Sequence, residues 1–187
     1  ISRAHLQEFQ KNLIINGETG GNVIVISKSG KVVYHHIENS NKTGDKTITD
    51  QTLFPIWSMT KPVTTIAALI LKEKNLLDFN DPVSKYIPAL KNLMCKSKAG
   101  IIPCKNEIKI IDLITHLSGL SYYKDFMLDG MRAKSLEDLM DDIVEHPLEF
   151  EPGESYFYGL GHDVLGRVIE VVSGVSFQAF MQTYIFE

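Results

Sequence analysis

Hydrophobic residues recur at helical spacing in several separate segments of this chain. Leu6, Phe9 and Leu13 follow one another at intervals of three and four residues, which predicts a helix over residues 3–15. The same criterion predicts further helices over residues 59–75, 108–116, 135–145, 163–173 and from 177 onward, with a short one inside residues 78–88. Most of the chain after residue 57 is therefore expected to be helical.

Two short runs of β-branched residues lie near the start. Residues 22–26 and 31–37 flank Ser-Lys-Ser-Gly, which predicts an antiparallel hairpin. Residues 38–52 are polar and predict a loop, and residues 91–106 predict a lysine-rich surface excursion without strands. A lone two-stranded sheet is rarely stable. We therefore expect an α+β fold in which further strands lie beyond Glu187.

This pattern predicts two regions. Residues 1–56 are expected to hold the helix and hairpin of a sheet region, and residues 57–187 an all-helical region. The chain of 187 residues is 44% hydrophobic, which suffices for a substantial core. The C-terminal strands of the sheet are expected to be missing from this chain, which then forms the N-terminal part of the fold.

Charge and cysteine content exclude some classes of partner. Lysine and arginine number 19 against 23 acidic residues, and they are scattered, so we expect no nucleic-acid partner. The longest apolar stretch, around residues 66–71, is too short for a transmembrane segment. No signal peptide is visible. Cys95 and Cys104 are compatible with a disulfide or with two free thiols, and a disulfide would suit a periplasmic or secreted location, which we favour over a cytoplasmic one.

The strongest chemical signal is Ser58 followed three residues later by Lys61, at the start of a predicted helix and after an apolar, aromatic lead-in that suggests a buried strand-to-helix junction. Positions i and i+3 share a helix face, so the lysine amine can reach the serine hydroxyl. The positive end of the helix would favour a serine alkoxide and hold the amine neutral, able to accept the serine proton. The Ser58 backbone N–H would be one oxyanion-hole donor.

A second candidate, Tyr158, lies on the loop before the helix predicted from residue 163. A tyrosine can act as a general base if a cation lowers its pKa, and Lys61 would be that cation.

The other polar and aromatic residues near these motifs are weaker candidates for a catalytic role. His116 is expected to cap a helix and support the floor of the site rather than act in a triad, and Tyr122 and Tyr123 to line the cleft or pack. His162 and Asp163 are expected to begin a helix, with Asp163 complementing its dipole. We expect no metal site and no cofactor.

Three segments resemble one family in the expected order. Residues 52–88 (TLFPIWSMTKPVTTIAALILKEKNLLDFNDPVSKYIP) look like the active-site helix of the penicillin-recognising serine hydrolases. IKIIDLITHLSGL and FEPGESYFYGLGHDVLGRVIEVVSG resemble the downstream turn and the tyrosine motif of the branch with class C β-lactamases, D-alanyl-D-alanine carboxypeptidases and family VIII carboxylesterases. The resemblance implies a β-lactamase/transpeptidase-like fold, with Ser58 as nucleophile, Lys61 as the lysine of its motif and Tyr158 as the tyrosine of the second motif.

Two departures from the family pattern shape the expected function. Leu160 stands where β-lactamases of this branch carry an asparagine, which favours a carboxylesterase over a β-lactamase or a D-alanyl-D-alanine carboxypeptidase. The third motif, which supplies the second oxyanion donor, has no match after Tyr158, so that donor is expected outside this chain. The expected substrate is a small ester or amide, and the missing C-terminal half or a homo-oligomer could be a partner. The rival from another class is a non-catalytic binding or scaffold protein of the same fold.

Overall fold

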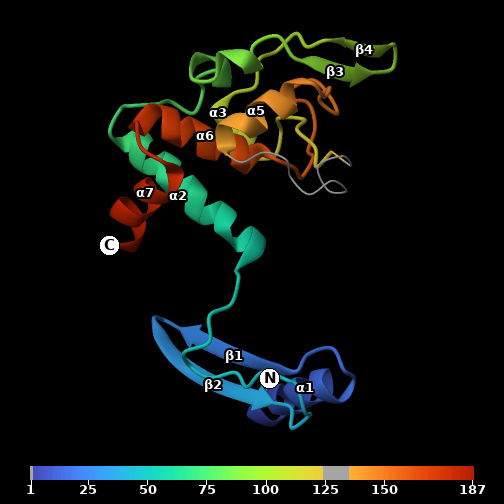
Figure 1. Ribbon diagram of the computed structural model, residues 1–187, viewed down its shortest axis with the longest axis vertical. Helices are drawn as coiled ribbons and strands as arrows, with labels where there is room; N and C mark the ends of the chain where they lie inside the picture. The colour runs from blue at the N-terminus through green and yellow to red at the C-terminus, as the bar shows by residue number, and fades with distance from the viewer. Residues whose placement is uncertain (1, 124–134) are drawn as a thin grey trace. The chain divides into compact units, whose positions relative to one another are not determined.

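The computed structural model describes residues 2–123 and 135–187, which fall into two compact units, Ile1–Pro55 and Ile56–Glu187 (Figure 1). The first unit is a helix packed on a hairpin. α1 (Arg3–Ile15) begins at Ser2, whose hydroxyl accepts a hydrogen bond from the N–H of His5. β1 (Gly21–Lys28) and β2 (Lys31–Asn39) pair antiparallel, as the sequence predicts.

A buried glutamine joins α1 to the hairpin. Gln10 is fully buried, and its Nε2 donates to Asn22 Oδ1 at 2.8 Å and to the carbonyl of His36 at 3.1 Å. The hydroxyl of Tyr34 donates to Gln10 Oε1 at 3.3 Å. Both ends of the amide are thus satisfied, which offsets the cost of removing it from water.

The second unit is mostly helical. Its helices are α2 (Thr60–Glu73), α3 (Ile110–Ile114), α5 (Leu136–Val144), α6 (Gly161–Ser173) and α7 (Phe177–Met181), with short 3₁₀ turns at Trp57–Met59, Val83–Lys85 and Pro88–Leu90 and a π turn at Gln182–Phe186. α6 lies at the centre and packs against α2, α3, α5 and α7 (Figure 1). Its buried residues Val164, Leu165, Val168 and Ile169 form the middle of the core.

The structure corrects the prediction for residues 91–106. This segment contains a second hairpin, β3 (Met94–Ser97) and β4 (Gly100–Pro103), which the sequence missed because each strand is only four residues long. β3 also exchanges backbone hydrogen bonds with Leu148: Leu148 N–H donates to the carbonyl of Met94 at 2.8 Å, and Lys96 N–H to that of Leu148 at 2.9 Å. The statement that strands are absent after the first hairpin is therefore wrong.

Two helices differ in detail from the expectation. α3 spans only Ile110–Ile114, because the carbonyl of Ile108 accepts from Val83 N–H and His116 leaves the helical conformation with φ 60°. On α2 the buried residues are Thr64, Ala67, Ala68 and Leu71, whereas Ile66 is 48% exposed. Among the described residues, no single helix is long and apolar enough to cross a membrane; a bent pair, Gly161–Ser173 with Phe177–Phe186, satisfies length and composition only.

Candidate active site

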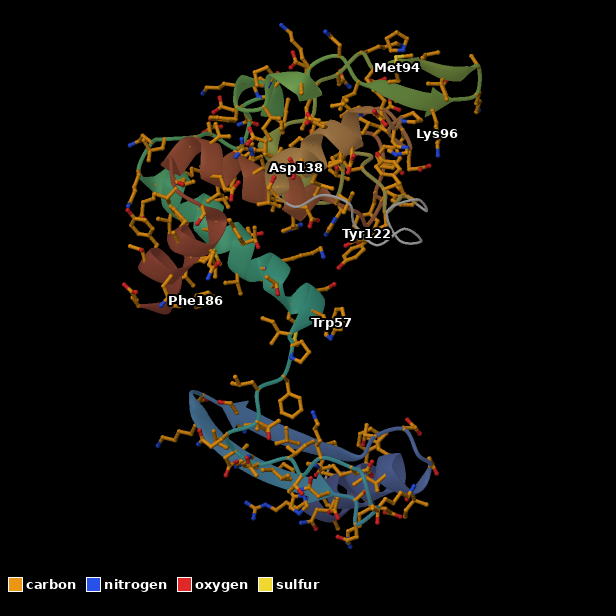
Figure 2. All side chains as sticks on the ribbon, viewed as in Figure 1. Trp57, Met94, Lys96, Tyr122, Asp138 and Phe186 are labelled. Carbon is orange, nitrogen blue, oxygen red and sulfur yellow. The ribbon has the colours of Figure 1, made fainter. Side chains whose placement is uncertain are left out.

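Ser58 lies on the 3₁₀ turn Trp57–Met59, directly before α2. Trp57 has φ 48°, a left-handed conformation that few residues other than glycine adopt, and such strain concentrates at functional sites. Ser58 is exposed and Trp57 is 82% exposed at the start of α2 (Figure 2). The expected buried strand-to-helix junction is therefore wrong, since an irregular segment precedes the turn.

The predicted tyrosine lies next to the predicted nucleophile. The hydroxyl of Tyr158 donates a hydrogen bond to Ser58 Oγ at 2.6 Å, across 100 positions of sequence. Tyr158 reaches this position from the loop that precedes α6. At this oxygen–oxygen distance a proton can pass directly between the two side chains, as general-base catalysis requires.

Lys61 completes the cluster from the first turn of α2. Its Nζ lies 4.7 Å from the centre of the Tyr158 ring and donates to the hydroxyl of Tyr122 at 3.3 Å. Tyr122, for which the sequence left cleft and packing roles open, therefore lies at the site (Figure 2).

The surroundings of the site favour the charged form of Lys61 and lower the pKa of Tyr158. Partial burial lowers the pKa of Lys61, but hydrogen bonds with Tyr158 and Tyr122 outweigh it and raise the pKa above its ordinary value. The hydrogen bond with Lys61, followed by that with Ser58, lowers the pKa of Tyr158. The expectation that the helix end keeps the Lys61 amine neutral is therefore wrong; of the two predicted bases, the arrangement suits Tyr158.

The loop of Tyr158 is held by the turn that follows α3. The N–H of Phe157 donates to the carbonyl of His116 at 2.9 Å, and the N–H of Gly153 to that of Leu117 at 2.9 Å. Gly159 lies so close to this turn that a Cβ there would be 2.0 Å from the carbonyl oxygen of Leu120. Only glycine, which lacks a Cβ, fits at this distance, so Gly159 allows the loop of Tyr158 to pack directly against the backbone of Leu120.

Two histidines lie beneath these residues. His116 lies just past α3, as predicted, and its ring centre is 4.7 Å from that of Tyr158. His162, in the first turn of α6, lies 5.1 Å from His116 and contacts Thr65. From the sequence, His162 was expected only to begin a helix. Its position directly after the tyrosine motif was the one feature that could have indicated a place near the site.

A cavity of about 380 Å³ opens beside Ser58 and Lys61. Leu136 and Phe177 provide apolar walls, and Asp163 of α6 also lines it. Asp163 lies in the first turn of α6, as expected. Burial nevertheless raises the pKa of its carboxyl group. A cavity of this size suits a small ligand.

The remaining candidates take other positions. Cys95 and Cys104 are free thiols; burial raises the pKa of Cys104 to about 12. Leu160 is 4% exposed and belongs to the core, so its side chain brings no hydrogen-bonding group to the site. Within residues 2–123 and 135–187, no group of three or more histidine, cysteine or acidic side chains could hold a metal ion.

Comparison with known proteins places this arrangement in a family. The Beta-lactamase family model matches residues 3–187. The chain belongs to the β-lactamase family. Penicillin-binding protein 4* of Bacillus subtilis is 28% identical over 191 residues, covering 98% of this chain and 39% of its own length. Lovastatin esterase of Penicillium rubens is 32% identical over 174 residues, covering 81% and 43%.

A solved structure agrees with this placement. EstCE1, a hydrolase with promiscuous acyltransferase activity, superposes with a TM-score of 0.82 at 26% identity, covering 96% of this chain and 49% of EstCE1. The β-lactamase/transpeptidase-like fold, expected from the resemblance, is confirmed. The chain spans less than half the length of these relatives.

Proposed function

We propose that this chain provides the nucleophile and the general base of a serine hydrolase that works through an acyl-enzyme. The observation that carries the proposal is the 2.6 Å contact between the Tyr158 hydroxyl and Ser58 Oγ, with Lys61 Nζ 4.7 Å from the same tyrosine ring. Named esterases and penicillin-binding proteins among the relatives support the same class of reaction.

The proposed reaction begins with proton transfer from Ser58 to Tyr158. For this step Tyr158 must first have lost its own proton to solvent, which its lowered pKa favours. As a phenolate stabilised by the Lys61 ammonium, it accepts the Ser58 hydroxyl proton while Oγ attacks the carbonyl carbon. The Ser58 N–H is proposed as one oxyanion donor, and the second is still expected outside this chain. When the intermediate collapses, the leaving oxygen or nitrogen takes the proton from Tyr158. Water then gives a proton to Tyr158 and attacks the acyl-serine carbonyl carbon. The bond from that carbon to Oγ breaks as Oγ takes the proton back from Tyr158, which releases the acid and restores the Ser58 hydroxyl and the Tyr158 phenolate.

The substrate is proposed to be a small carboxylic ester, with amides as the alternative. Leu160 offers no amide group to a β-lactam or peptide side chain, because its side chain is aliphatic, and it packs in the core. The apolar walls of the cavity beside Ser58 suit an uncharged acyl group. β-Lactamase and D-alanyl-D-alanine carboxypeptidase activities are the second candidates within the family. A periplasmic or secreted location stays part of the proposal.

The test is hydrolysis by the intact protein of a short-chain p-nitrophenyl ester beside a chromogenic cephalosporin. We expect ester turnover and covalent labelling by a fluorophosphonate, both lost in Ser58→Ala. Ser155→Ala, which removes an exposed serine close to Tyr158 in sequence, is the matched control and should keep both. Turnover of the cephalosporin alone would favour a β-lactamase. Absence of turnover and of labelling would instead support a non-catalytic protein.

A further inference from the structure

A cluster of aromatic rings lies beneath the candidate site, and two of its members are histidines to which the proposed reaction gives no role. The ring of His116 lies 4.7 Å from Tyr158, 5.8 Å from Tyr156 and 5.1 Å from His162, centre to centre. His162 is only 8% exposed. His116 therefore packs against the tyrosine that is proposed as the base, and His162 packs against His116.

The backbone at His116 adopts a left-handed conformation where the chain leaves α3. His116 follows α3 with φ 60°. The corresponding left-handed positions after α1, α2 and α6 are Gly17, Asn75 and Gly174, residue types that tolerate this conformation. For most other residues it is unfavourable, because Cβ approaches the following carbonyl oxygen too closely. At α3 this cost falls on a histidine whose ring packs against Tyr158.

His162 connects α6 to the first turn of α2. Its Nε2 lies 3.3 Å from Thr65 Oγ1, and Thr65 Oγ1 lies 3.1 Å from the carbonyl oxygen of Lys61. The threonine hydroxyl has one hydrogen and donates it to that carbonyl, so it accepts from His162. We therefore assign the proton of neutral His162 to Nε2. The Nδ1 atoms of His162 and His116 are buried without a hydrogen-bond partner among the described residues.

Both imidazoles are neutral near pH 7. Burial, the neighbouring His116 and the charge of Lys61 lower the pKa of His162 to about 4. Burial and Lys61 also lower the pKa of His116. Neutral rings can pack under Tyr158 without repelling the ammonium group of Lys61.

We propose that His116 and His162 are positioning residues that form a neutral bridge between the loop of Tyr158 and the first turn of α2. His116 supports the phenol ring, and His162, through Thr65, fixes the backbone at Lys61. The bridge keeps the ammonium group against the phenol, so it sets the acidity of Tyr158. This inference rests on the proposed function for its consequence in catalysis, but the geometry can be tested without turnover.

The direct readout is the pKa of Tyr158, followed by NMR titration of ¹³Cζ-labelled tyrosine, with Tyr158→Phe assigning the signal. His116→Asn removes the ring and tolerates a positive φ, whereas His116→Phe keeps a ring and removes both nitrogens. We expect His116→Asn to move the pKa of Tyr158 up, toward the ordinary value of about 10, and His116→Phe to leave it close to wild type.

A second pair of variants tests the His162 side of the bridge. Thr65→Val removes the hydroxyl between His162 and Lys61, and Thr65→Ser keeps it. We expect Thr65→Val to raise the pKa of Tyr158 as His116→Asn does, and Thr65→Ser to leave it unchanged. This pair also decides the question if His116→Asn fails to fold, which thermal unfolding would reveal.

Ester hydrolysis provides the catalytic readout. A displacement of about 1 Å can lower a rate about 100-fold, so we expect His116→Asn and Thr65→Val to lower kcat at least tenfold with KM little changed. Loss of rate in His116→Phe equal to that in His116→Asn would assign a chemical role to the nitrogens and overturn the bridge. An unmoved Tyr158 pKa in both His116→Asn and Thr65→Val would also overturn it. Turnover that survives Ser58→Ala would refute the proposed function instead, while the titration still decides the bridge.

Discussion

Replacing Tyr158 by phenylalanine removes one oxygen atom from the centre of the proposed mechanism. The lost hydroxyl is the group 2.6 Å from Ser58 Oγ, and it contributes no other core packing, since Tyr158 is 39% exposed. The ring itself can still pack on His116 and under Lys61. The substitution therefore separates proton transfer from the placement of the ring.

The expected effect follows from the role of a positioned general base. Such a base contributes about 10²–10⁴-fold to the rate. At about 1.36 kcal/mol per tenfold change, Tyr158→Phe should raise the activation free energy by about 3–5 kcal/mol. The free energy of unfolding should fall by no more than about 1–2 kcal/mol, because hydrogen bonds at a partly exposed hydroxyl are lost but no cavity forms.

The assay is steady-state hydrolysis of a p-nitrophenyl ester, with kcat and KM determined separately. Tyr156→Phe is the matched control: Tyr156 is 62% exposed, lies on the same loop and also contacts the ring of His116. We expect the control to stay within about threefold of wild type. If Tyr158→Phe kept more than a tenth of the wild-type kcat, Tyr158 could not be the base, and the assignment would pass to Lys61.

Three further predictions follow from the same geometry. Lys61→Met removes the main cause of the lowered Tyr158 pKa, so the acid limb of the profile of kcat/KM against pH should move to higher pH. Gly159→Ala places a Cβ 2.0 Å from the carbonyl oxygen of Leu120, and should lower both Tm and kcat; a variant with wild-type values for both would contradict the close approach. His162 has a folded pKa of about 4 against about 6.5 unfolded, so stability should be full above pH 6.5 and fall by about 3 kcal/mol toward pH 4 in urea unfolding, with a smaller fall in His162→Gln.

The sequence predicted the elements with strong periodicity and missed those defined by distant contacts. α1, α5 and α6 follow their apolar spacing to within two residues. The β3–β4 hairpin is too short to show a pattern, and it pairs with Leu148, about fifty positions later. On α2, Ile66 is 48% exposed while Ala67 and Ala68 are buried, so the packing of the helix, and not the residue type alone, decides which apolar side chains are covered.

The candidate site was predictable in its residues but not in its protonation states. Ser58, Lys61 and Tyr158 could be named from motifs, and the structure brings all three together. Which group serves as the base depends on the hydrogen bond that Lys61 donates to Tyr122 and on its hydrogen bond with Tyr158, and these join positions far apart in sequence. No local pattern encodes such contacts, so the neutral lysine expected from the helix end alone was wrong.

The pair of Ser58 and Lys61 therefore says less about whether the site is complete than the placement of Tyr158 does. Ser58 lies on the 3₁₀ turn Trp57–Met59 and Lys61 in the first turn of α2, so one continuous segment of chain positions both. Tyr158 arrives only because the turn after α3 receives its loop: Phe157 N–H bonds to the carbonyl of His116, and Gly159 permits close contact with Leu120. A change in that turn should therefore disable Ser58 as completely as a change beside it. The segment from His116 to Leu120 is where we expect the activity of this chain to be most sensitive at a distance from the nucleophile.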